Sequence, residues 1–223
     1  MGAPYSIKMN KNLKILNSIE SLTSNLPEPM VQTIIKKFPE NRPFFVLFSC
    51  ILSLRAKDSV TLPISIKLFK KYNTLEKLAY AKIENLEKII KPIGFFRQKA
   101  ATIKNIASNI LEKHHGVIPN NYQELTLIKG IGPKTANLVL SEAFDIPAIC
   151  VDTHVHRLSN HLKILDTKTV EETQEELEKI YPKKYWKKIN KLFVTWGQFG
   201  CKPNSKKCKC YIINENIKKV DNV

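Results

Sequence analysis

Apolar residues recur at helical spacing along most of the chain, and strand-like alternation of period two is rare. The opening stripe repeats every third residue: Leu13, Leu16, Ile19 and Leu22. Further stripes predict helices over residues 43–56, 103–111, 152–164 and 186–196. The pattern therefore predicts a mostly helical protein.

Turn and capping residues separate these stripes. We expect Asp58 and Asn73 each to cap a helix, and Thr169 to open a third helix through a capping box. Gly116 supplies a C-terminal stop for the helix before it. From Cys201 onward the pattern predicts a short, basic and irregular tail.

The charge balance changes this picture of a plain helical protein. The 223 residues carry 36 Lys and Arg against 20 Asp and Glu, a formal net charge of +16. A chain this basic suits a polyanion, most often a nucleic acid, although a solvated lysine-rich surface is the alternative. Only four of the cations are arginines, and lysine holds phosphate as a point charge without reading bases. The balance favours binding to a nucleic-acid backbone.

Cysteine usage and hydropathy indicate the compartment. The cysteine count of five is odd and we find no secretory signal, which favours a reducing cytosol over a disulfide framework. The longest apolar run, 43–54, is too short to span a bilayer. We therefore expect a cytoplasmic, nucleoid-associated monomer that is neither secreted nor membrane-bound.

The segment 127–136, Leu-Ile-Lys-Gly-Ile-Gly-Pro-Lys-Thr-Ala, is the most informative stretch. Gly130 and Gly132 flank one apolar residue between two predicted helices, and Pro133 suits a first helical position. A glycine turn that leads into a helix N-terminus can bind phosphate through backbone N–H groups, without reading sequence. A tight turn between packed helices is the alternative for the glycines alone, but the full pattern is that of a helix-hairpin-helix element.

Two side chains that follow this turn, those of Lys134 and Asp152, are candidates for a chemical role. Lys134 lies just inside the following helix, where the dipole, nearby lysines and partial burial favour a neutral amine. Such an amine can attack a sugar carbon and form a Schiff base. Asp152 can accept its proton or simply cap its own helix, and Lys134 alone could be one more surface lysine.

Four motifs in order resemble the endonuclease III family, the bifunctional DNA glycosylases and abasic-site lyases of the helix-hairpin-helix superfamily. They lie at residues 52–58, 93–100, 127–136 and 151–154, and the resemblance covers roughly residues 30–210. It implies an all-α fold of two helical lobes with a DNA-binding cleft between them. One lobe is expected over 36–147, and 1–35 plus 148–223 form the other.

The resemblance also implies a role for each motif. Lys134 stands at the position of the nucleophile and Asp152 at that of the essential carboxylate. Arg55 matches a residue that enters the gap left by an extruded base. The family usually has glutamine there, but a guanidinium can still hydrogen-bond the orphaned base. Phe95 matches an apolar wedge that holds the strand kinked. The expected DNA-backbone contacts are those of the turn: Gly130, Ile131, Gly132 and Thr135.

The C-terminal region departs from the family. Many members hold a [4Fe–4S] cluster through four cysteines, whereas this chain has only Cys201, Cys208 and Cys210 there, with Asn216 where the fourth would fall. A cubane cluster takes four thiolates. We therefore expect no required cofactor, and interpret the three cysteines as a degenerate cluster site.

The leading hypothesis is a bifunctional glycosylase and lyase that removes oxidised pyrimidines from double-stranded DNA in base excision repair, through a lysine Schiff base. The alternatives are a monofunctional or mismatch-directed glycosylase of the same superfamily, and a DNA-binding module without catalysis. Lys134 counts against the monofunctional alternative, and the missing cysteine is the one feature that favours the binding module.

Overall fold

The computed structural model describes residues 3–201 and 208–221, with side chains for 11–201 and 208–217. Within these residues every regular element is a helix, so the predicted all-α class is confirmed. The chain divides into two compact units, each described here by itself: Met30–Ile146, and Met1–Pro29 with Pro147–Val223. No helix in the described part of the chain is both long and apolar enough to cross a membrane.

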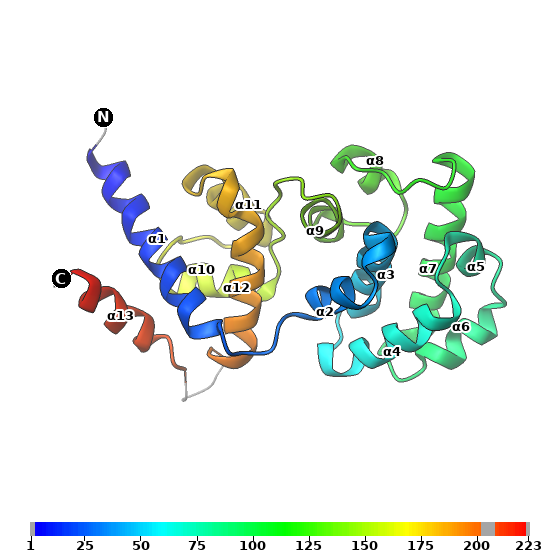
Figure 1. The fold of residues 1–223 in the computed structure, drawn as a ribbon. Helices are drawn as coiled ribbons and strands as arrows, with labels where there is room; N and C mark the ends of the chain where they lie inside the picture. The colour runs from blue at the N-terminus through cyan, green and yellow to red at the C-terminus, as the bar shows by residue number, and fades with distance from the viewer. Residues whose placement is uncertain (1–2, 202–207, 222–223) are drawn as a thin grey trace. The chain divides into compact units, whose positions relative to one another are not determined.

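The Met30–Ile146 unit is one continuous stretch of helices (Figure 1). They are α2 (Met30–Lys37), η1 (Pro39–Asn41), α3 (Arg42–Ser53), α4 (Asp58–Lys71), α5 (Leu75–Ala79), α6 (Ile83–Ile90), α7 (Phe96–Lys113), α8 (Tyr122–Leu127) and α9 (Pro133–Ala143). Helix α3 contacts α2, α4, α7 and α9 and is buried on most sides, as its unbroken apolar run predicts. Its three phenylalanines, Phe44, Phe45 and Phe48, form an aromatic cluster with Phe38 and with Phe69 of α4.

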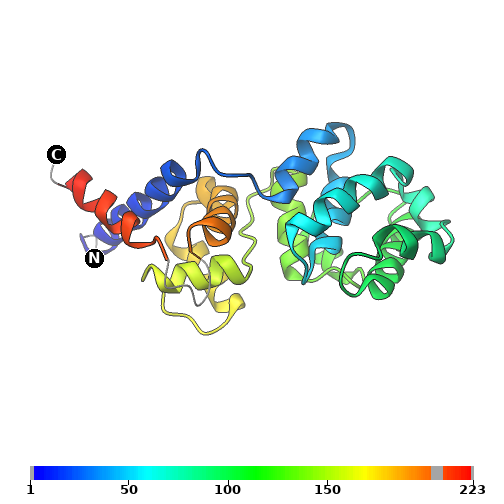
Figure 2. The ribbon, with the colours of Figure 1, turned by 90° about the horizontal axis from the view of Figure 1, so that it is seen from below.

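The second unit is assembled from both ends of the chain. Its helices are α1 (Ala3–Thr23), α10 (Thr153–His161), α11 (Val170–Ile180), η2 (Lys183–Tyr185), α12 (Trp186–Phe199) and α13 (Tyr211–Asp221). Helix α1 packs against α12 and α13, and α1 and α13 run side by side in both views (Figures 1 and 2). The predicted stripe on α1 supplies Leu16 and Ile19, both fully buried, to a core shared with α10 and α12.

Two predicted helix caps differ from the structure by one residue. Asp58 is not a cap: α4 is capped at Lys57, and the Asp58 carboxylate accepts a hydrogen bond from the Met30 N–H at 3.4 Å. Thr74, not Asn73, caps α5. Thr169 does cap α11 as predicted, since its hydroxyl accepts from the Glu172 N–H at 3.1 Å.

The chain after Cys201 is more regular than predicted. Residues 211–221 form α13, whose Ile213 is fully buried in the core that α1 and α12 share. The prediction of a wholly irregular tail is therefore wrong. The division after Pro29 also differs from the predicted one after residue 35, because a boundary there would cut α2.

Candidate functional site

The helix-hairpin-helix turn joins α8 to α9 as predicted. Gly130 has φ +104°, a left-handed conformation that glycine adopts without strain. Gly132 is the N-cap of α9, with no side-chain cap hydrogen bond, and Pro133 occupies the first helical turn. The Ile131 N–H donates to the Ile128 carbonyl at 2.9 Å, which closes the turn.

The surface of this turn is mostly backbone. Gly130, Gly132 and Pro133 are exposed, and no atom lies within 4 Å of the position that a Cβ on Gly132 would take. First-turn N–H groups of a helix have no carbonyl partner one turn earlier. Ala136 is the first residue of α9 whose N–H bonds back, to the Gly132 carbonyl at 3.0 Å. Such an exposed, positively polarised helix start suits an anion.

Two of the predicted DNA-backbone contacts have buried side chains. Ile131 is 4% exposed and Thr135 2% exposed. The Thr135 hydroxyl lies 3.6 Å from the Cys50 thiol of α3, within the core of the unit. Only the backbone of these two residues is therefore available at the turn, and the Thr135 side chain contacts α3.

Lys134 is half-buried in the first turn of α9. Asp152 is half-buried at the start of α10, where its Oδ1 accepts from the N–H groups of His154 at 2.9 Å and Val155 at 3.0 Å. The interpretation of Asp152 as a helix cap is thus correct, and this structural role does not exclude a chemical one. Because the two residues belong to different units, their meeting at one site stays a prediction.

Arg55 and Phe95 share an uncommon backbone geometry. Arg55, in the turn after α3, has φ 53°, and Phe95, the N-cap of α7, has φ 60°. Both side chains are exposed, Phe95 to 61%. Non-glycine residues rarely adopt this conformation, and they are found disproportionately at functional sites. The structure thus presents two strained, solvent-facing residues at the positions expected to enter DNA.

Lys99 is a feature that the sequence analysis missed. It lies in the first turn of α7, is 7% exposed, and donates from Nζ to the Leu52 carbonyl of α3 at 2.8 Å. Burial lowers the pKa of Lys99 from 10.5 to about 8. This hydrogen bond ties the end of α3, which leads to Arg55, to the start of α7, which follows Phe95. No spacing rule in the sequence signals it.

The three C-terminal cysteines gather around one histidine. The ligand atoms of His161, Cys201, Cys208 and Cys210 all lie within 4.8 Å of one another, a group that could hold a metal ion. His161 ends α10, Cys201 follows α12, and Cys208 and Cys210 precede α13, so the four residues come from three separate segments. The sequence analysis identified the cysteines and missed His161, whose distance along the chain hides it.

The family's [4Fe–4S] cluster does not fit this group. A cubane cluster takes four thiolates, and the described part of the group offers three with one imidazole. Asn216 does not complete the set, since its amide donates to the Ser18 hydroxyl of α1 at 3.2 Å. The four ligand atoms are also closer together than a cluster requires, because four irons and four sulfides must stand between its thiolates.

The thiols in this group are not equivalent. Burial raises the pKa of the Cys210 thiol well above its usual range. For Cys208 burial acts in the same direction, but hydrogen bonds from the Cys210 backbone and the Cys201 thiol, together with the nearby Arg157 charge, lower the pKa below its usual value. Of these two thiols, Cys208 is therefore the more readily ionised.

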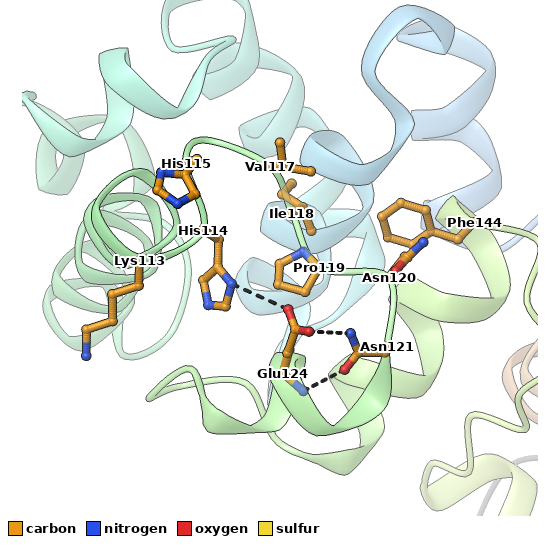
Figure 3. Close-up of a pocket in the computed structure, with 10 residues that line it drawn as sticks. All are labelled: Lys113, His114, His115, Val117, Ile118, Pro119, Asn120, Asn121, Glu124 and Phe144. Carbon is orange, nitrogen blue, oxygen red and sulfur yellow. Dashed lines mark hydrogen bonds and ion pairs between the residues drawn. The ribbon is translucent and has the colours of Figure 1, made fainter.

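A pocket in the Met30–Ile146 unit lies apart from the predicted site residues. Its volume is about 400 Å³, and it is lined by the end of α7, the loop before α8, and Phe144. In Figure 3 the His114 imidazole points toward the Glu124 carboxylate, 3.6 Å away, and Asn121 bonds to the same carboxylate. These polar groups bind each other, so we assign the pocket no chemistry.

Comparison with known proteins identifies a matching family and several similar proteins. The model of the HhH-GPD superfamily of base excision DNA repair proteins matches residues 48–183. Endonuclease III of Thermotoga maritima is 44% identical over 192 residues, which are 84% of this chain and 90% of that protein. A trapped endonuclease III–DNA covalent intermediate has a TM-score of 0.72 at 32% identity, covering 85% of this chain and 95% of that one. A thermostable thymine-DNA glycosylase, with TM-score 0.78, 23% identity and coverage of 96% and 95%, is alike in fold alone.

The exposed glycine turn and the matched residues define a protein of the helix-hairpin-helix superfamily of base excision repair. Within that superfamily the chain belongs to the endonuclease III family. The predicted family is confirmed, and with it the predicted class of enzyme, a DNA glycosylase and abasic-site lyase.

Proposed function

We propose that this enzyme removes oxidised pyrimidines from double-stranded DNA and then cleaves the strand, with Lys134 as the nucleophile. The observation that carries the proposal is the position of Lys134, half-buried in the first helical turn after an exposed glycine turn. Its structural neighbours add support: one is a trapped covalent endonuclease III–DNA intermediate and another is a non-covalent complex of endonuclease III with DNA.

The first step is base removal. The neutral Lys134 amine attacks C1′ of the sugar, and the C1′–N bond to the damaged base breaks as the new C–N bond forms. The base leaves with the bonding electron pair and takes up a proton. The Asp152 carboxylate accepts the proton that Lys134 loses and stabilises the positive charge that develops on the sugar.

The second step is strand cleavage. The bond from C1′ to the ring oxygen then breaks, the ring oxygen takes up a proton and becomes a hydroxyl, and a protonated Schiff base remains between C1′ and Lys134. Loss of a proton from C2′ then breaks the C3′–O bond, and the 3′ phosphate departs. Water hydrolyses the Schiff base and returns the amine. The nucleophile and the carboxylate are both side chains of this protein, so we propose that the chemistry requires no cofactor.

The DNA is held by the phosphate backbone and opened by side chains. We propose that the exposed backbone at Gly130 and Gly132 binds phosphate, with the buried side chains of Ile131 and Thr135 holding it in place. Arg55 fills the gap left by the extruded base, and Phe95 wedges the strand. The net charge of +16 supports backbone binding. None of the five cysteines, all of which lie within the described residues, forms a disulfide, which fits our proposal of a cytoplasmic enzyme. We expect it to act as a monomer.

Borohydride trapping tests this proposal. The full chain is incubated with duplex DNA that carries thymine glycol or an abasic site, and borohydride reduces any Schiff base to a stable adduct. We expect an adduct on both substrates with the wild-type chain. In Lys134→Ala the rate of adduct formation should fall on the order of 10³-fold or more. Lys129→Ala is the matched control, because Lys129 is an exposed lysine of the same turn and its loss leaves the amine of Lys134 intact.

The substrates separate the alternatives. An adduct at the abasic site alone establishes the lyase and overturns oxidised pyrimidine as the base substrate. Base release without any adduct points to a monofunctional glycosylase. Binding with neither product contradicts the role of Lys134 and favours the binding module.

A further inference from the structure

The histidine and cysteines of the second unit come from three places in the fold. His161 is the last residue of α10, Cys201 follows α12, and Cys208 and Cys210 precede α13. The Cys208 sulfur lies 3.3 Å from the Cys201 sulfur and 3.4 Å from Nε2 of His161. The four ligand atoms therefore converge on one point and are not merely near one another on the surface.

These separations match a single tetrahedral ion. With zinc–sulfur bonds of about 2.3 Å and zinc–nitrogen bonds of about 2.0 Å, ligand atoms at the corners of a tetrahedron lie roughly 3.5–3.8 Å apart. The two separations quoted above are close to that value, and no pair exceeds 4.8 Å. Three thiolates and one imidazole in tetrahedral array are a ligand set typical of structural zinc.

Surrounding groups support thiolates at these positions. Arg157, four residues before His161 and so on the same face of α10, donates to the Cys201 sulfur at 3.0 Å. The Trp196 indole N–H donates to the Cys210 sulfur at 3.3 Å. Zinc with three thiolates has a net charge of −1, which the Arg157 guanidinium offsets. Hydrogen bonds of this kind orient metal ligands and stabilise their charge.

The backbone also holds the two cysteine segments together. The Lys209 N–H donates to the Gly200 carbonyl at 3.0 Å, which sets the residues beside Cys201 against those between Cys208 and Cys210. Cys201 and Cys210 are 2% and 5% exposed and belong to the edge of the core, whereas Cys208 is half-buried and His161 is exposed.

We propose that His161, Cys201, Cys208 and Cys210 bind one Zn²⁺ as a structural site, in place of the family's iron–sulfur cluster. The ion would join three parts of the unit: the end of α10, the residue after α12 and the segment before α13. Because Asp152 caps the other end of α10, the site also steadies the helix that carries the proposed carboxylate. This proposal stands whichever base the enzyme excises.

Metal content is the first test. The full chain is produced in cells supplied with both iron and zinc and purified without air, and then zinc, iron and acid-labile sulfide are measured. We expect one zinc per chain and neither iron nor sulfide in comparable amount. Iron and sulfide in place of zinc, or no retained metal, would overturn the proposal.

Variants then test the ligand that only the structure reveals. Zinc affinity of the metal-free chain is measured by competition with a chromophoric chelator. We expect His161→Asn to weaken it by about 100-fold or more. The matched control is His115→Asn, an exposed histidine of the other unit at φ 52°, where asparagine is well tolerated. Asn216→Ala should also leave affinity unchanged, because its amide bonds to Ser18.

A cobalt spectrum keeps the test decisive if His161→Asn fails to fold. Co²⁺ added to the metal-free chain should show tetrahedral d–d bands and sulfur-to-cobalt charge transfer. In His161→Cys, a fourth thiolate should strengthen the charge-transfer band while the ion stays bound. A spectrum that is identical in wild type and His161→Cys, or equal zinc affinity in His161→Asn and wild type, contradicts the assignment of His161.

Discussion

The helix-hairpin-helix turn and the histidine–cysteine group are built in opposite ways. The turn is one run of ten residues, 127–136, and presents backbone from exposed glycines. The histidine–cysteine group draws side chains from three segments, and His161 lies forty residues before Cys201. A local device can be recognised in a single sequence, because its geometry depends on neighbours along the chain. A site made of side chains that are distant in the sequence depends on packing. Changing one residue of such a site can change which ligand it binds.

The same contrast holds for the units that carry them. Met30–Ile146 is continuous and centres on the buried helix α3, whereas the second unit brings the first and last helices of the chain together. The core of the first unit is therefore built around one central helix, whereas the second unit gathers its apolar core from both ends of the chain and gains further links from side chains such as Arg157.

The largest expected effect tests whether Asp152 acts beyond its local role as a cap. In Asp152→Asn the amide oxygen can still accept from the His154 and Val155 N–H groups, but the carboxylate charge is gone. We expect single-turnover base excision to fall by about 10²- to 10⁴-fold with little change in thermal stability.

Asp152→Ala is the companion variant, because it removes both the cap and the charge. It should lose the same activity and in addition about 1 kcal/mol of stability. Full activity in Asp152→Asn would show that capping is the whole role of this residue. Asp152 would then have only a local role at the start of α10 and no part in the chemistry.

The next effect tests the backbone at the turn. A Cβ on Gly132 meets no atom of the protein within 4 Å, and its φ of −93° suits any residue, so Gly132→Ala should fold normally. It should nevertheless weaken binding to undamaged duplex by about tenfold, because the methyl stands between the helix start and a phosphate. Fluorescence anisotropy at fixed salt measures this, and unchanged affinity would remove Gly132 from the interface.

Gly130 should behave differently although it lies two residues away. Its φ of +104° and a Thr102 methyl 2.8 Å from the position of a Cβ make Gly130→Ala a folding defect. We expect a loss of about 1–3 kcal/mol, seen as faster amide hydrogen exchange in α8 and α9. If exchange there matches that of Gly132→Ala, the turn does not depend on the left-handed glycine.

The smallest effect concerns Lys99 and has a defined sign. Its pKa is about 8 in the folded protein against 10.5 ordinarily, so between these values the unfolded chain binds more protons. The free energy of unfolding of the Met30–Ile146 unit should therefore gain a contribution that grows as pH rises from 8 toward about 10, where tyrosines begin to ionise.

Lys99→Met should lack this pH-dependent gain, and the exposed Lys88→Met should keep it. Hydrogen exchange of α3 and α7 across this pH range measures the difference. A wild-type profile that is flat or falling would show that burial does not lower the pKa of the Lys99 amine.

The sequence predicted the helices well and their ends less well. The apolar stripes placed α1, α3, α7, α10 and α12, because helical periodicity is a property of consecutive residues. The caps at Asp58 and Asn73 were wrong, since the exact path of the chain decides at which of two adjacent residues a helix begins. Helix α13 was missed because its burial depends on α1, almost two hundred residues earlier.

The sequence by itself determined the class of enzyme, because the turn at 127–136 and the motifs around it are short, ordered and specific. It also determined that Asp152 begins a helix. Only the tertiary structure decided that the side chains of Ile131 and Thr135 face the core, and that Lys99 bonds to the end of α3. It alone brought His161 to the cysteines. The physical reason is that spacing along a chain fixes which residues share a helix face, whereas contact between distant residues is decided by how those faces pack.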